Sequence, residues 1–198
     1  MKKIILIIVA VLIGVSASAQ RIGIVAGVTG PNSALKDSQI GTFDQYHLGL
    51  VSSLPVMPGI RIQPELIYKV KGTTVDQIGS GNEEFDMKVG FLEFGLEAQA
   101  GIGGSLMRVY GLAEPFIGYN IRDTDFKGDK VVDNLSWAKT ECGLAIGAGV
   151  ELLSLVQASV KYFWNMGAAN VRDESNKIYD GDSVRNFNGM TLSVALLF

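Results

Sequence analysis

The chain has 198 residues, of which 47% are hydrophobic and only 19% are charged, and its formal net charge is -3. This composition excludes a charge-rich disordered protein and offers no electrostatic footprint for nucleic acid. A single cysteine and a single histidine exclude a disulfide framework, a cysteine-rich zinc site and the usual multi-histidine metal centres, so we expect no metal and no other cofactor. The 24 glycines argue against a helical bundle and favour close-packed β-structure.

The N-terminal segment has the three parts of a secretory signal peptide. Lys2 and Lys3 form a basic region, residues 4–15 are apolar or glycine, and Ser16–Ala19 is a small-residue cleavage sequence. The apolar run is shorter than the roughly 20 residues that span a bilayer, which argues against a membrane anchor. We therefore predict a signal peptide at residues 1–19 and one exported domain at residues 20–198, in which no segment is long and apolar enough for a membrane helix.

The exported part contains eight runs in which apolar residues alternate with polar or small ones, the pattern of β-strands with two different faces. These runs lie at residues 21–29, 45–54, 60–71, 92–99, 109–120, 139–150, 156–165 and 189–198. Just before the fourth run, Met87 and Val89 have the opposite phase from Leu92 and Phe94. This change of phase predicts a β-bulge near Gly90.

The composition of the two faces indicates which one points inward. One face is uniformly bulky, whereas the other combines charged residues with many glycines, alanines and serines. The interior of an eight-stranded barrel is just wide enough to be filled by side chains, and small residues beside a few long charged ones fit it better than large aliphatics. A soluble lipocalin-like barrel would turn the bulky set inward instead. We therefore expect an all-β fold, an eight-stranded antiparallel up-and-down transmembrane β-barrel whose bulky face contacts lipid.

The connections and the aromatic residues agree with a membrane barrel. Long polar segments at residues 30–43, 72–84, 122–136 and 167–186 alternate with short ones at 55–59, 101–104 and 152–154. Strict alternation of this kind is expected when one rim faces the cell exterior and the other faces the periplasm. The aromatic residues on the bulky face at the long-segment ends of their runs form one interfacial girdle: Tyr46, Tyr68, Tyr119, Tyr162 and Trp164.

Several segments of the sequence resemble a known family. Residues Ile62–Tyr68, followed by Lys71 and Gly72, resemble the third-strand signature of the PorT-like outer-membrane β-barrel family. Further resemblances to strands of that family occur, in order, at Phe91–Phe94 (with Phe91 replacing a tyrosine), Gly143–Glu151 and Lys161–Gly167. The terminal Phe198 matches the aromatic end that the outer-membrane assembly machinery reads.

The resemblance implies an eight-stranded barrel in the outer membrane of a Gram-negative bacterium. Its expected partners are outer-membrane lipids and lipopolysaccharide, the assembly machinery and an unidentified protein that binds the long loops, but no nucleic acid. The branch after which the family is named takes part in protein secretion. No residue of this sequence allows us to assign that role to this chain.

The charges on the small-residue face are the candidate functional set: Arg61, Glu65, Lys69, Glu93, Glu97, Glu114, Lys139, Glu141 and Lys161. They could form the selectivity lining of a pore or a proton path, or they could form a salt-bridge network that fills the barrel. Unpaired buried charges are costly, and the near-balance of signs therefore favours the structural network.

Other candidate sites are weaker. His47 faces the lumen, but a catalytic role needs a positioned nucleophile and an orienting acid, and no spacing identifies either. The segment Asp123–Asp129 fails as a calcium loop, because Lys127 stands where an oxygen ligand is required and Asn134 stands where a glutamate is required. Acidic residues between 173 and 182 could bind a divalent cation, although solvated acidic loops are the commoner case. We therefore predict no catalytic, cofactor-binding or metal-binding residues.

The expected function is that of a non-enzymatic structural or interaction scaffold with a charge-plugged lumen and long extracellular loops. One alternative is a narrow pore for small solutes, gated by the lumen charges. A second is an accessory component of protein secretion across the outer membrane. A lipid-modifying enzyme that uses His47 ranks below both.

Overall fold

The computed structural model describes residues 21–31, 45–76, 84–122, 140–166 and 188–198. Eight strands account for nearly all of them: β1 (Arg21–Pro31), β2 (Gln45–Met57), β3 (Ile60–Asp76), β4 (Glu84–Gly103), β5 (Met107–Arg122), β6 (Thr140–Leu152), β7 (Val156–Asn165) and β8 (Gly189–Leu197). Within these ranges no helix is long and apolar enough to cross a membrane.

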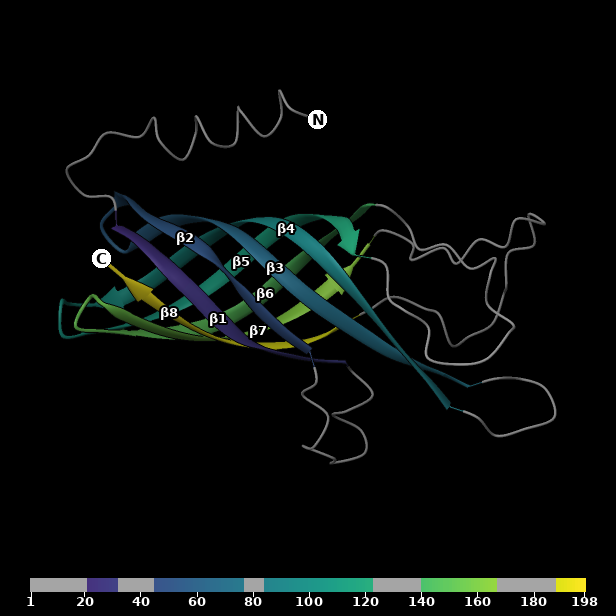
Figure 1. Ribbon diagram of the computed structural model, residues 1–198. Helices are drawn as coiled ribbons and strands as arrows, with labels where there is room; N and C mark the ends of the chain where they lie inside the picture. The colour runs from purple at the N-terminus through teal and green to yellow at the C-terminus, as the bar shows by residue number, and fades with distance from the viewer. Residues whose placement is uncertain (1–20, 32–44, 77–83, 123–139, 167–187) are drawn as a thin grey trace, which may run out of the picture.

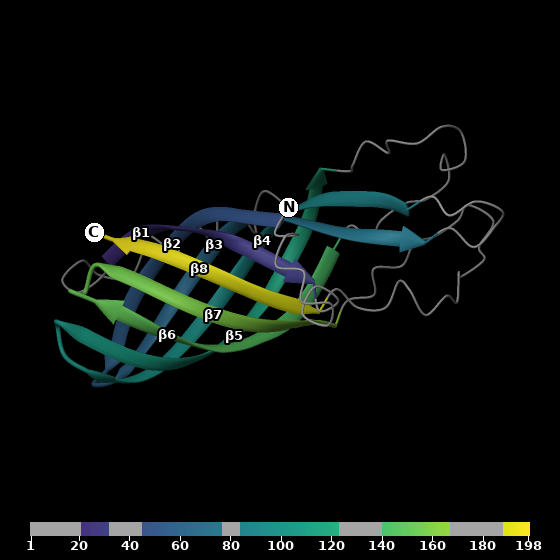
Figure 2. The ribbon, with the colours of Figure 1, turned by 90° about the horizontal axis from the view of Figure 1, so that it is seen from below.

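The strands form a closed barrel in which each strand pairs with its sequence neighbour. All eight pairings are antiparallel, including the closing one between β1 and β8, which runs from Gly23↔Leu197 to Pro31↔Gly189. Figures 1 and 2 show the resulting cylinder. Closure leaves no open edge along the paired strands. The prediction of an all-β, eight-stranded antiparallel up-and-down barrel is confirmed.

Short turns join the strands at one end of the cylinder, where the C-terminus also lies (Figure 1). We call this the turn end and the opposite one the loop end. The connections are Pro58–Gly59, Gly104–Leu106 and Leu153–Leu155, within or next to the predicted short segments. Gly59 has a φ of 81°, a conformation that costs glycine little.

Two of the three short connections are tighter than the sequence predicted. Pro55–Met57 belongs to β2, and Gly101–Gly103 belongs to β4. Each pair of strands therefore continues its ladder further toward the turn than the hydrophobic alternation indicated. The reason is that backbone hydrogen bonds do not require an alternating side-chain pattern.

A second difference lies at the loop end, where β3 and β4 project beyond the other strands (Figure 2). Their pairing continues without interruption from Lys71↔Val89 to Asp76↔Glu84. Residues 72–76, which the sequence pattern predicted to lie in a long connection, therefore belong to a strand. The β-branched residues Thr73, Thr74 and Val75 suit this conformation, although they lack strict alternation.

The predicted bulge near Gly90 is present, but the extra residue lies on the neighbouring strand. Gly90 pairs with Arg122 and Phe91 pairs with Asn120, so Ile121 of β5 is left without a partner in this ladder. The register between β3 and β4 is continuous through Val70↔Gly90. The bulge therefore bends β5 at the loop end of the barrel.

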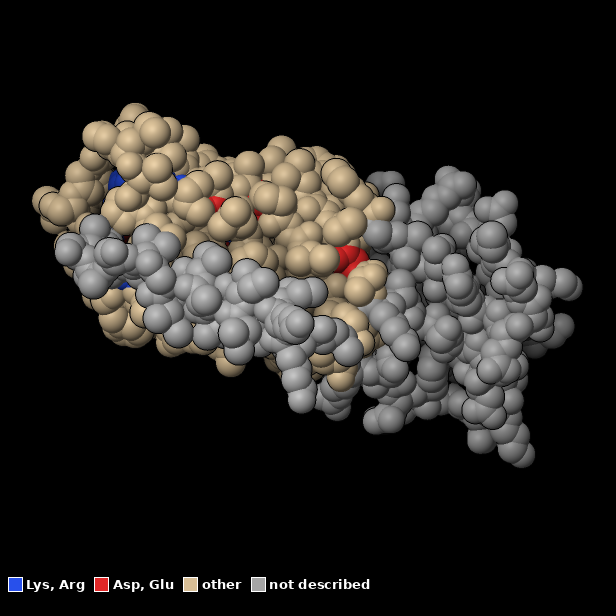
Figure 3. All heavy atoms as spheres, turned by 90° about the horizontal axis from the view of Figure 1, so that it is seen from above, with Lys and Arg blue, Asp and Glu red and all other residues tan. Residues whose placement is uncertain are grey.

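The two faces of the strands point as the alternation predicts. Leu48, Leu50 and Ile117 are each 57% exposed on the outside, whereas Glu65 and Glu97 are only 2% and 1% exposed. In Figure 3 the described part of the molecule is almost entirely free of charged atoms on the face shown. The outer surface is thus an apolar band, and the charged side chains lie inside.

The aromatic residues of the predicted girdle lie on the outer face. Tyr46 and Tyr119 are 51% and 42% exposed. The rings of Tyr162 and Trp164 meet edge to face with their centroids 4.8 Å apart. Amphipathic rings of this kind are favoured where hydrocarbon meets water.

Side chains of several kinds fill the lumen. Apolar residues contribute two clusters, one around Val25 and Leu197 and one formed by Phe116, Ala145 and Phe163. Glycines leave room for the longer side chains; a Cβ atom at Gly95 would collide with the carboxylate of Glu114. The interior therefore resembles a packed core with charges embedded in it.

Candidate functional site

Four charged residues meet in the middle of the lumen, and we call them the central cluster: Glu65, Glu97, Glu114 and Lys161. Lys161 Nζ lies 3.1 Å from Glu65 Oε2, 2.6 Å from Glu97 Oε2 and 2.7 Å from Glu114 Oε2. None of the four residues is more than 6% exposed. The lysine projects from β7 and the glutamates from β3, β4 and β5, so these contacts cross the interior.

The central cluster is satisfied by hydrogen bonds, although its charges are unequal. A lysine ammonium has three donors, which matches three carboxylate partners. Gln63 Nε2 donates to Glu65 Oε1 at 2.9 Å, and Gln99 Nε2 donates to Glu97 Oε1 at 2.7 Å. One ammonium nevertheless faces three carboxylates, so the integrity of the cluster depends strongly on Lys161.

The three carboxylates also have the spacing of a metal site. One oxygen from each of Glu65, Glu97 and Glu114 lies within 4.8 Å of the others. The ammonium of Lys161 lies within 3.1 Å of an oxygen of each. Lys161 therefore supplies the positive charge that a metal ion would otherwise bring to these oxygens.

Closer to the loop end, Lys69 and Glu93 form a second ion pair with an Nζ–Oε2 distance of 3.1 Å. Lys69 Nζ also lies 4.6 Å from the ring centroid of Phe163 and 5.8 Å from that of Phe116, within the range of cation–π attraction. Glu141 accepts a hydrogen bond from Asn165 Nδ2 at 2.5 Å. The aromatic rings and the ion pair together occupy this part of the lumen.

A third group of charges lies at the turn end. Arg61 forms an ion pair with Glu151, and Arg21 Nη1 lies 3.6 Å from Glu151 Oε1. Arg108 donates to Gln99 Oε1 at 2.8 Å and to the Gly59 carbonyl at 3.1 Å. Of these charged residues, only Arg61 was among the predicted candidates.

Arg21, Arg108 and Glu151 were missed as candidates, although the sequence contains a signal for the last two. Arg108 has the same phase as Glu114, and Glu151 has the same phase as Glu141. Both lie one residue outside the alternating runs. Extending each run to the turn would have found them, because a strand keeps its two faces up to its last paired residue.

In the structure a serine lies next to His47, a contact that the spacing of residues in the sequence did not predict. His47 Nε2 lies 3.0 Å from Ser193 Oγ, and the two residues project from β2 and β8 on either side of β1. Gly27 pairs with both, and a Cβ there would collide with the histidine ring. His47 is 2% exposed, and its Nδ1 has no hydrogen-bond partner in the described part of the chain. Among the residues that the structure describes, the pair thus has no orienting acid, and its burial leaves no access for a substrate.

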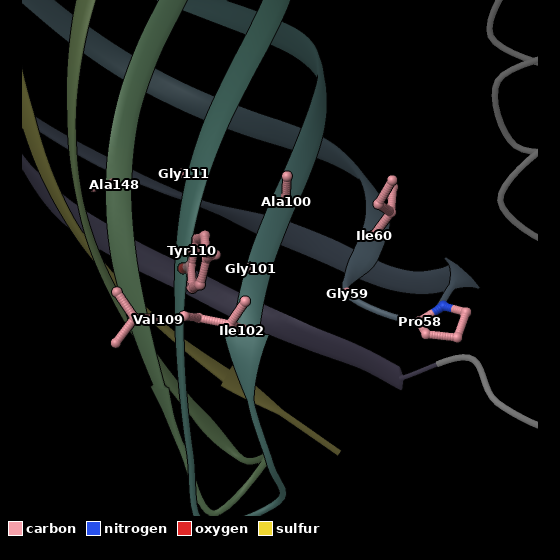
Figure 4. A pocket seen from close by; sticks show the side chains of 10 residues that line it. All are labelled: Pro58, Gly59, Ile60, Ala100, Gly101, Ile102, Val109, Tyr110, Gly111 and Ala148. Atoms are coloured by element: carbon pink, nitrogen blue, oxygen red, sulfur yellow. The ribbon is translucent and has the colours of Figure 1, made fainter.

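Beside this pair is a small cavity of about 20 Å³, lined by residues that include His47, Lys69 and Glu114. A space of this size holds about one water molecule. A larger hollow of about 580 Å³ lies on the outer face near the turn end (Figure 4). Its floor contains Gly101 and Gly111, flanked by apolar side chains such as Val109, and none of its lining residues is charged. Neither space has the form of a catalytic pocket.

Phe198 lies at the turn end of the barrel. Its side chain is 73% exposed, and its backbone N–H donates to the Ile22 carbonyl at 2.7 Å. This hydrogen bond ties the last residue to β1.

Several predictions concern residues outside the described ranges. They are the signal peptide at residues 1–19, Lys139, most of the long connections and the acidic segments at 123–129 and 173–182.

The comparisons with known proteins bear on the family. A family model described as "Outer membrane protein beta-barrel domain" matches residues 13–168, which contain β1 to β7. No curated protein and no solved structure matches the chain. The family match covers most of the chain and agrees with the closed barrel and its apolar outer band, and it indicates the outer membrane as the location. The chain belongs to the outer membrane protein β-barrel domain family.

Proposed function

We propose that this protein is a non-enzymatic structural or interaction scaffold of the outer membrane. In this proposal the lumen is plugged, and the segments at the loop end offer the surface for a protein partner. The observation that carries the proposal is the contact of Lys161 with Glu65, Glu97 and Glu114 across the interior.

The packing around the central cluster supports a closed lumen. Lys161 reaches strands on the far side of the barrel, and side chains above and below it form further hydrogen bonds, such as Gln99 Nε2 to Gln63 Oε1 at 3.3 Å. A permeating ion would have to part these buried contacts. Breaking a buried network of charges is expensive, which favours a plug over a gate.

Conductance in planar bilayers tests this proposal. We expect the purified wild-type barrel to show no stable open steps, and the Glu97→Gln variant, which keeps the size of the side chain, to remain equally silent. Stable steps in the wild type whose size or ion selectivity changes in Glu97→Gln would instead support the narrow-pore alternative. The control is Gln157→Glu, which adds a negative charge to the lumen outside the central cluster.

The non-enzymatic part of the proposal predicts that the His47–Ser193 pair has no chemical role. We expect strains with His47→Gln or Ser193→Ala to have the same membrane lipid composition as the wild type, because the pair is buried and has no orienting acid among the described residues. Mass spectrometry of extracted lipids measures this. The same loss or gain of a lipid species in both variants would show that the pair is catalytic.

We also infer that the chain belongs to the PorT-like branch of barrels and is exported through a cleaved signal peptide at residues 1–19. The motif residues at 62–68 support the first inference: in β3 they place Gln63 and Glu65 in the lumen network. In this proposal the assembly machinery reads Phe198, and lipids and lipopolysaccharide surround the outer face. An accessory role in secretion is an alternative within the same scaffold function.

A further inference from the structure

The charges at the turn end are unbalanced in a way that points to a ligand. We call this group the arginine ring, after its three guanidinium groups. It is a level of the lumen to which six strands contribute: Arg21, Arg61, Gln99, Arg108, Glu151 and Gln157. Cross-strand pairing sets this level through Arg61↔Gln99, Arg108↔Glu151 and Glu151↔Gln157. Among the described residues, three guanidinium groups thus share this level with one carboxylate, that of Glu151.

The carboxylate of the ring is already engaged. Glu151 accepts from Arg61, receives a further hydrogen bond from Gln157 Nε2 at 2.9 Å and lies 3.6 Å from Arg21 Nη1. Arg108 is only 5% exposed, and its hydrogen bonds go to two neutral oxygens, those of Gln99 and Gly59. No acidic side chain in the described ranges forms an ion pair with it. The Arg108 guanidinium lies 5.0 Å from the ring centroid of Tyr110. A nearly buried guanidinium without a directly paired carboxylate is costly, so an additional anion would stabilise the ring.

The ring is positioned so that an anion can reach it. The side chains of Arg21 and Arg61 are 27% and 16% exposed, whereas that of Lys161 in the central cluster is 7% exposed. Arg21 donates to the Ser154 carbonyl and Arg108 to the Gly59 carbonyl, which places the ring directly beneath two of the turns. In Figure 3 the blue atoms appear at the turn end, and the red ones lie further toward the loop end.

We propose that the arginine ring binds an anion of the phosphate class at the turn end of the barrel. The planar guanidinium fork pairs with two oxygens of a phosphate at once, which a lysine cannot do. The excess of two positive charges matches a doubly charged phosphate. Deeper in the lumen, three carboxylates face one ammonium, so the anion is repelled from the middle and stops at the ring. The phosphate belongs either to the headgroup of an anionic lipid or to a free solute.

Calorimetric titration of the full barrel tests this site and distinguishes the two sources. The protein is held in a maltoside detergent without phosphate and titrated with inorganic phosphate. In separate runs it is titrated with short-chain phosphatidylglycerol, and with phosphatidylcholine as the headgroup of zero net charge. We expect saturable binding of at least one of the first two probes, weakened by added sodium chloride.

The substitution that tests the ring is Arg108→Gln, which keeps a polar side chain that can donate hydrogen bonds and removes the charge. Because a hydrogen bond to a charged group contributes about 1.5–3 kcal/mol, we expect binding to weaken by at least about tenfold. The control is Arg122→Gln, which removes the same charge at the loop end of the same strand and leaves binding unchanged.

Each outcome decides the proposal. Binding of inorganic phosphate assigns the site to a free solute, and binding of phosphatidylglycerol alone assigns it to a lipid headgroup. Absence of binding by the wild type, equal binding of phosphatidylcholine, or equal weakening in Arg108→Gln and Arg122→Gln would overturn it. If Arg108→Gln does not show the gel mobility of a folded barrel, Arg21→Gln replaces it, because Arg21 is the first residue of β1 and is more exposed. This site does not depend on the scaffold role proposed above.

Discussion

The Lys161→Met variant is expected to unfold at a markedly lower urea concentration than the wild-type barrel. Methionine fills a similar volume but leaves Glu65, Glu97 and Glu114 without the ammonium that lies within 3.1 Å of each. Removing one partner from a buried ion network typically costs about 3–5 kcal/mol. Unfolding in lipid vesicles can be followed by the mobility of unboiled protein on a gel, since a folded barrel and its unfolded chain migrate differently.

Two further variants show whether the loss comes from the charge imbalance. Lys69→Met is the matched control, because Lys69 forms an ion pair with one described carboxylate, that of Glu93, and we expect a smaller loss of stability. Adding Glu65→Gln and Glu97→Gln to Lys161→Met should recover part of the loss, because fewer uncompensated carboxylates then remain buried. Equal urea midpoints for Lys161→Met and the wild type would show that the central cluster contributes nothing to stability.

A charge on the outer face should be nearly as damaging as the loss of one inside. Leu50 lies in the middle of β2 and is 57% exposed on the outer surface. If that surface lies in hydrocarbon, Leu50→Arg should destabilise the barrel in vesicles by about 2–4 kcal/mol, as arginine does near the bilayer midplane. On the outside of a soluble barrel, the same exposed position would accept arginine almost without cost. The urea midpoint in vesicles measures the difference.

The matched control for this prediction is Ile102→Arg. Ile102 is 83% exposed and lies at the turn end of β4, where the membrane interface is expected. An arginine near the interface costs only about 0–1 kcal/mol. The membrane orientation would be contradicted by two variants that lose the same stability, or by a Leu50→Arg barrel as stable as the wild type.

The strands and the direction of their faces could be read from the amino-acid sequence with few errors. Residues such as Glu65 and Leu66 follow one another in a period-two pattern, and the structure places the first inside and the second on the outer side. The errors concern places where pairing continues without that pattern, as at residues 72–76. They also include the bulge, whose extra residue is Ile121 of β5, because alternation along one strand cannot show which of two paired strands holds an extra residue.

The candidate site could be predicted only in part from the sequence. The inward charges Glu97 and Lys161 could be assigned to the lumen, but their contact at 2.6 Å could not. Nor could the meeting of His47 with Ser193, 146 residues later in the chain. Arg108 was not among the predicted candidates, because its significance depends on the contacts of its guanidinium in the closed barrel: it donates to the neutral oxygens of Gln99 and Gly59 and forms no ion pair with a described carboxylate.

The physical reason is that the sequence determines the face of the strand on which a side chain lies, but not the position along the barrel axis at which it meets side chains of other strands. The order of residues along a strand specifies which side chains point inward, since that depends only on the pleat of one strand. The height at which each inward side chain meets those of other strands depends on the tilt and stagger of all eight strands when the barrel closes. Local chemistry was therefore enough to separate the lipid-facing residues from the lumen. The closed barrel was needed to set three carboxylates against Lys161 and to bring three arginines to the level of Glu151.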